Sequence, residues 1–133
     1  MGRMKIRAWD NVKDRMYYAG EEDDVVFHFE SNGIVATDIT EDEEEFRTLR
    51  HLKYMQYTGL KDSNGNEIYD GDIVKISGHP FQGSIDIDGN YVVGYNELME
   101  LSCGGWYLHR MRHWAEVIGN KFENPELLQG GNK

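Results

Sequence analysis

The segment at residues 52–76 constrains the fold of this chain more than any other. Its first part, LKYMQYT, is rich in aromatic residues and alternates side chains between two faces, which is typical of a strand. Residues that tolerate left-handed backbone angles and bond their own main chain come next: Asp62, Asn64, Gly65 and Asn66. Such residues favour a reversal of the chain. The segment therefore predicts two strands joined by a turn.

The strand after this turn has the composition of a buried strand. EIY leads into DGDIVKI, where Asp70 and Gly71 predict a second bend. Ile73, Val74 and Ile76 then supply branched apolar side chains, which pack well on a pleated surface. Small SH3-like barrels often begin with a run such as DGDIV, so by analogy this strand could begin such a barrel.

Length and composition indicate one mostly β domain. The 133 residues suit a single domain with its own core. Eight Tyr, five Phe and three Trp favour strands, and 15 Gly against 2 Pro favour many turns. We therefore expect a β-rich α+β domain over residues 1–133, built from hairpins as a curved sheet or a small SH3-like barrel.

Within that domain the order of elements follows from local patterns. We expect N-terminal hairpins at 1–40, an acidic helix at 41–51, central and C-terminal strands at 52–120, and a short helix at 124–129. Thr40 and Glu43 form a capping-box pattern at the start of the first helix, and a solvated acidic loop is the alternative there. Asn124 before Pro125 indicates the start of the terminal helix.

Charge and cysteine content exclude several kinds of protein. A net charge of −10 argues against sequence-independent nucleic-acid binding, which depends on cationic side chains. Cys103 is the only cysteine, so the chain can form neither an internal disulfide nor a multi-cysteine zinc site. No apolar run approaches the roughly 20 residues that span a bilayer. We expect a cytoplasmic protein without a membrane role.

A basic cluster between two tryptophans is the strongest candidate site. We predict that it binds a protein partner, because Arg and Trp are enriched at interfaces. The predicted partner-binding residues are Trp106, His109, Arg110, Arg112 and Trp114. The same local patch could serve a nucleic acid through phosphate contacts. A third interpretation is an alternating strand whose Arg and His side chains face solvent or pair with carboxylates.

Metal binding and catalysis are the other hypotheses for this region. His109 and His113, four residues apart, lie on one side of either a helix or a strand, and Cys103 could add a thiolate. These residues would serve a metal-dependent hydrolase. A calcium loop starting at Asp62 fails, because its sixth position is Glu67 rather than glycine and its twelfth is Ile73 rather than glutamate. No phosphate loop or other catalytic motif is present, so we expect no cofactor and no enzyme.

Three segments of the chain resemble the YopX family of phage and prophage proteins. MQYTGLKDSNGNEIYDGDIV at 55–74 resembles the family signature. IRAWD followed by MYY resembles the family's opening, and EVIGNKFENPELL at 116–128 resembles its closing, in the same order. The chain has Ile6 where the family usually has an aromatic residue, and Asp70 where it often has glutamate. Residues 20–50 and 77–113 lie outside the resemblance.

The resemblance implies a mostly β, phage-borne domain in a bacterial host cell, without a catalytic motif and with a tendency to form oligomers. Together with the residue patterns, it predicts a phage or prophage accessory protein that acts by protein–protein binding. Homo-oligomers would form through unpaired sheet edges and exposed aromatic side chains. A host or phage protein is the expected partner, and the nucleic-acid and hydrolase alternatives stay open.

Overall fold

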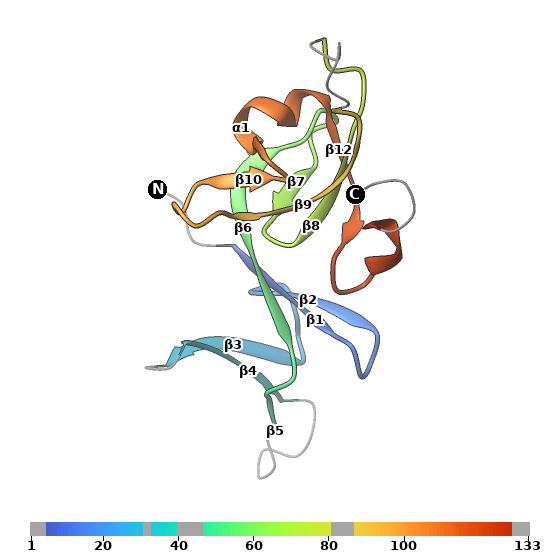
Figure 1. Ribbon diagram of the computed structural model, residues 1–133. Coiled ribbons are helices and arrows are strands. Elements are labelled where there is room, and N and C mark those ends of the chain that lie inside the picture. The colour runs from blue at the N-terminus through green and yellow to red at the C-terminus, as the bar shows by residue number, and fades with distance from the viewer. Residues whose placement is uncertain (1–4, 31–32, 40–46, 81–86, 129–133) are drawn as a thin grey trace. The chain divides into compact units, whose positions relative to one another are not determined.

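The computed structural model describes residues 5–30, 33–39, 47–80 and 87–128 (Figure 1). The chain divides into two compact units, unit 1 (Met1–Gln56) and unit 2 (Tyr57–Lys133). Both units consist mainly of antiparallel strands, so the prediction of a mostly β fold is confirmed. That the two units form a single domain stays a prediction.

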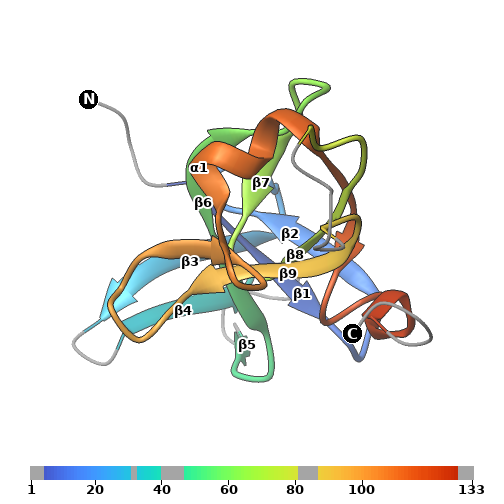
Figure 2. The ribbon, with the colours of Figure 1, turned by 45° about the horizontal axis from the view of Figure 1, so that its top comes forward.

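Unit 1 contains the two predicted N-terminal hairpins. The first hairpin consists of β1 (Ile6–Asp10) and β2 (Arg15–Tyr18). The second consists of β3 (Val25–Glu30) and β4 (Gly33–Asp38), and these two strands run side by side in Figure 2. The start of β6 (Lys53–Lys61) pairs with the other edge of β1. The buried core consists of Ala8, Tyr17, Val25, Ala36, Leu49 and Leu52.

The predicted helix at 41–51 is wrong where the structure describes that segment. Arg47–Leu49 forms the strand β5, which pairs antiparallel with β4, and residues 40–46 lie outside the described part of the chain. Strand pairing buries Leu49 at the edge of the unit 1 core. A helix cap contributes about 1 kcal/mol, and burying a Leu side chain contributes about 1.5 to 3 kcal/mol. The tertiary environment therefore outweighs the local helix signals.

Unit 2 is built around a strongly curled five-stranded antiparallel sheet, in the order β11-β10-β9-β8-β12 (Figure 1). Its strands are β8 (Asp72–Ile76), β9 (Gly89–Tyr95), β10 (Leu101–Cys103), β11 (Trp106–Tyr107) and β12 (Ala115–Asn120). The short helix α1 (Leu108–Met111) and the 3-10 turn η2 (Arg112–Trp114) connect β11 to β12. The curved-sheet prediction is confirmed, as is the short C-terminal helix, observed as η3 (Pro125–Leu128).

The segment at 52–76 forms the predicted strands and turns. The end of β6 pairs with β7 (Glu67–Tyr69), and the turn between them is organised by Asp62. One Asp62 oxygen, Oδ1, accepts bonds from the amides of Asn64 and Asn66, at 2.9 and 2.8 Å. The other, Oδ2, accepts the Val117 amide of β12 at 2.8 Å. Asp62 therefore connects the turn to the edge of the curled sheet, in a role that is structural.

The sequence also predicts a hairpin of GSIDI and YVVGY across a turn at Asp88, Gly89 and Asn90, and the described part of this region is arranged differently. Most of GSIDI lies at residues outside the described part, and Ile87 and Asp88 are not in a strand. β9 begins at Gly89, inside the predicted turn, and pairs with β8 and β10. The residues at 88–90 indicate a turn, but they do not indicate which distant strands pair with β9. Only the complete sheet supplies those partners, β8 and β10.

Candidate functional site

The basic cluster of the sequence lies on α1 and η2. An alternating strand is therefore the wrong interpretation for residues 108–114. Leu108 and Met111, three residues apart, fall on one face of the helical turn and are buried in the unit 2 core. His109 and Arg110 occupy the opposite side and are exposed. Burial of the two apolar side chains fixes which way the basic side chains face.

A cavity of about 500 Å³ opens beside this helical turn. We call it the aromatic cleft, and it is lined by His79, Ile87, Trp106, His109, Arg110, Met111, His113 and Trp114. Four of the five predicted partner-binding residues, all except Arg112, are in this set. Sequence analysis missed His79 and Ile87, because neither belongs to the local cluster and only the folding of the sheet places them beside it.

Trp114 is held in place by contacts on several sides. The ring centroid of His79 lies 4.4 Å from that of Trp114, with the ring planes inclined by 58°. The ring of His113 lies edge-on at 6.0 Å. The Trp114 carbonyl also accepts a bond from the Ser77 amide at 3.1 Å. The ring contacts orient the indole and the backbone bond positions its main chain, so that Trp114 forms one wall of the aromatic cleft.

Arg112 points to a different environment from Arg110. Its guanidinium donates a hydrogen bond to the Lys61 carbonyl, with Nη1 3.0 Å from the oxygen. This bond connects η2 to the end of β6 within unit 2. Arg112 therefore supports the position of the basic turn, whereas Arg110 lies on the wall of the cleft.

The structure does not bring Cys103 together with His109 and His113. Cys103 lies on β10, fully buried in the unit 2 core, whereas the two histidines are exposed. Burial raises the pKa of the Cys103 thiol to about 12, which leaves almost no thiolate at neutral pH. Across the part of the chain that the structure describes, no three His, Cys, Asp or Glu side chains are grouped to hold a metal ion. The geometry gives no support to a metal-dependent hydrolase at these residues.

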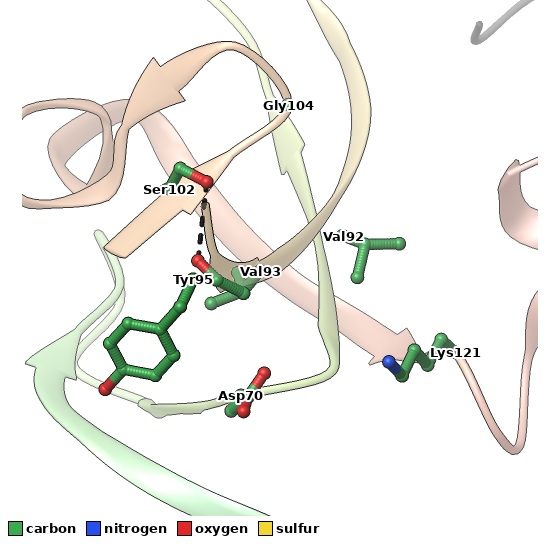
Figure 3. Close-up of a pocket in the computed structure, with 8 residues that line it drawn as sticks. Asp70, Val92, Val93, Tyr95, Ser102, Gly104 and Lys121 are labelled. Atoms are coloured by element: carbon green, nitrogen blue, oxygen red, sulfur yellow. Dashed lines mark hydrogen bonds between the residues drawn. The ribbon is translucent and has the colours of Figure 1, made fainter. Parts of the chain in front are cut away.

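A second hollow, of about 530 Å³, lies on the face of β9 and β10 (Figure 3). Its polar lining includes Asp70, Ser102 and Lys121, which supply a carboxylate, a hydroxyl and an ammonium group. Ser102 donates a hydrogen bond to the Gly94 carbonyl at 3.3 Å. The hydroxyl is thus already paired within the sheet, and this hollow is a hydrophilic surface rather than an apolar binding site.

Unit 1 contains a buried carboxylate at Asp10, the last residue of β1. The Asp10 side chain is fully buried and accepts bonds from the Tyr17 hydroxyl at 2.9 Å and from His51 Nε2 at 2.7 Å. The amides of Val12 and Lys13 donate to it as well. Burial alone would raise the pKa of Asp10, but these hydrogen bonds outweigh it and lower the pKa to about 2. Asp10 fastens the first hairpin to the segment before β6.

Comparison with known proteins gives a family and a fold. A solved structure, the crystal structure of protein EF1440 from Enterococcus faecalis, superimposes with a TM-score of 0.62 at 24% identity, covering 97% of this chain and 100% of that one. This likeness concerns the fold alone. No curated protein matches the chain. Wherever its structure is described, the chain has no helix of the length and apolar character that crossing a bilayer requires. The family model described as YopX protein matches residues 5–129, nearly the whole length, and the chain therefore belongs to the YopX family.

Proposed function

We propose that this YopX-family chain is a phage or prophage accessory protein that acts without catalysis, by binding a protein partner and by self-association in the cytoplasm of its host. The observation that carries the proposal is the aromatic cleft, in which two Trp side chains and one exposed Arg surround an apolar floor. Trp and Arg dominate the energetically important positions of protein interfaces, especially where they line a preformed pocket.

The floor and walls of the cleft suit binding more than chemistry. Ile87 and Met111 each expose only 4% of their surface and form an apolar floor. The only cysteine, Cys103, is buried, is not among the residues that line the cleft, and carries a protonated thiol. A nucleophile would need to be ionised and within reach of a base. The groups at hand are those of a recognition site.

Self-association is supported by a separate surface, the turn between β9 and β10. Leu98 and Met99 expose 73% and 75% of their surface there. Asn96 organises the turn, since its Oδ1 accepts the amides of Leu98 and Glu100, both at 2.9 Å. Met99 is held at φ 62, an angle that L-residues rarely adopt. A turn that presents apolar side chains at a strained backbone angle is suited to contact with another copy.

Light scattering on the purified chain tests the self-association. We expect a mass above that of one chain, and we expect the double variant Leu98→Asp/Met99→Asn to shift the mass toward the monomer. Val12→Asp is the matched control, because Val12 exposes 75% of its surface but lies in unit 1. A monomer at every accessible concentration contradicts this part of the proposal.

Photocrosslinking in bacterial cells tests partner binding. A photoreactive benzophenone amino acid is placed at Tyr107, which is 48% exposed and lies directly before α1. We expect a discrete protein adduct that is absent when the same group is placed at Val12. An adduct that persists unchanged after Arg110→Glu, or no protein adduct at Tyr107 at all, contradicts binding through the aromatic cleft.

A further inference from the structure

Among the described residues that line the aromatic cleft there is no carboxylate, although the chain is strongly acidic. The polar side chains among these described residues are Arg110, His79, His109 and His113. The whole chain carries 24 Asp and Glu against 14 Lys and Arg. The cleft is thus a local donor-rich site on an acidic protein, which is complementary to carboxylates.

We propose that this cleft binds an acidic segment of a partner protein, with one large apolar side chain of that segment inserted between the tryptophans. This inference rests on the proposed function and names the chemistry of the partner. Pockets that hold small ligands have volumes of about 300 to 1,000 Å³, so a cavity of about 500 Å³ has room for one large side chain with its neighbouring backbone. Met111 in the floor adapts to the shape of an inserted side chain.

The walls of the cleft are organised before a partner arrives. The ring of Trp114 contacts the rings of His79 and His113, at centroid distances of 4.4 and 6.0 Å. The hydrogen bond from Arg112 to the Lys61 carbonyl also holds the 3-10 turn in position. A rigid pocket loses little conformational entropy on binding, so an apolar anchor gains most of its burial energy.

The number of fixed charges favours a peptide over a nucleic acid. Among the lining residues that the structure describes, Arg110 is the only Lys or Arg, and His109 and His113 add N–H donors. A nucleic acid presents a charge at every nucleotide and needs several cations to offset them. One Arg with neighbouring donors matches one or two carboxylates beside an apolar anchor. The net charge of −10 also repels an extended phosphate backbone.

A selection from a random dodecapeptide display library tests the inference with the full chain as target. We expect the enriched peptides to share a Trp, Phe, Tyr or Leu flanked by Asp or Glu. Synthetic copies should bind in solution and shift the indole N–H signals of Trp106 and Trp114 in NMR spectra. Replacing the anchor residue by Ala, or its acidic neighbours by Lys, should abolish the shifts.

Matched variants distinguish an effect of the cleft residue Arg110 on binding from an effect of the net charge of the chain. Arg110→Glu should weaken binding roughly tenfold, because attraction is replaced by like-charge repulsion. Arg110→Lys should keep most of the affinity. Lys53→Glu changes the net charge equally at an exposed position in unit 1 and should leave binding unchanged. Arg110 is exposed, so unfolding curves of its variants should match the parent chain.

Several outcomes would overturn the inference. The selection could enrich no peptide, or the enriched peptides could share a basic sequence or no common sequence. The parent chain and Arg110→Glu could also bind the selected peptides equally. Tighter binding of a labelled single-stranded oligothymidine would assign the cleft to nucleic acid. A lower oligomer mass for Arg110→Glu would assign it to a second copy of the chain. If the Tyr107 photocrosslink nevertheless captures a protein, partner binding stands and only the chemistry named here fails.

Discussion

Replacing Asp10 by Asn isolates the contribution of one buried charge to the stability of unit 1. The side chain is fully buried and accepts four hydrogen bonds, from Tyr17, His51, Val12 and Lys13. Asn has nearly the same shape, and the Tyr17 hydroxyl can rotate to accept from the new amide group. The substitution therefore removes charge while it preserves packing.

The magnitude follows from the pKa of Asp10. The hydrogen-bond donors lower it from 3.8 to about 2, and each pKa unit corresponds to about 1.36 kcal/mol. We expect Asp10→Asn to lower the free energy of unfolding by about 2 kcal/mol at pH 7. That is a large share of the about 5 to 15 kcal/mol that holds a typical domain folded.

The pH dependence has a definite sign. Because the pKa of Asp10 is lower in the folded state than in the unfolded chain, its stabilisation is complete above about pH 4 and is lost as the pH falls through about 2. The free-energy difference between the parent chain and Asp10→Asn should therefore shrink over that range. Other carboxylates titrate there as well, and the difference between the two proteins removes their contribution.

The free-energy difference between the parent chain and Asp10→Asn is measured by urea unfolding at a series of pH values. Amide hydrogen exchange in β1 and β2 reports on unit 1 specifically. Asp23→Asn is the matched control, since Asp23 is exposed in the turn region before β3 and should change stability little. A loss below about 0.5 kcal/mol at pH 7, the range typical of surface substitutions, would refute the reasoning. So would a difference that stays constant on acidification.

Three further predictions concern unit 2. Gly104→Ala should lower the free energy of unfolding of this unit by about 2 kcal/mol or more in urea. A Cβ at Gly104 would lie 2.4 Å from the Tyr91 ring, and the backbone angle φ there is 62. Gly105→Ala is the control, because a Cβ at Gly105 has no neighbour within 4 Å. Cys103 should resist iodoacetamide at pH 8 until urea unfolds the chain, as burial raises its thiol pKa to about 12, and rapid labelling of the folded chain would contradict its placement. Asp62→Ala should speed amide exchange at Val117 in β12, whose amide loses its acceptor, and unchanged exchange there would contradict the structural role of Asp62.

Local signals predicted much of the fold because they act over a few residues. The reversal at 62–66 followed from residues that bond their own backbone, and the two N-terminal hairpins from short turns between alternating strands. The prediction of a helix at 41–51 is wrong at β5, because the capping signals on which it depends are also local and contribute little energy. Pairing with β4, which no short-range pattern encodes, decided that segment.

The sequence by itself determined the mostly β class, the YopX family and the cluster of Trp, His and Arg at 106–114. Only the tertiary structure decided that this cluster lies on a helical turn, that His79 and Ile87 complete a cleft with it, and that Arg112 faces Lys61 instead. Strand and turn preferences depend on neighbours in sequence, whereas a binding cleft or a buried charge such as Asp10 depends on which distant strands pair. That pairing is fixed by burial of the whole core.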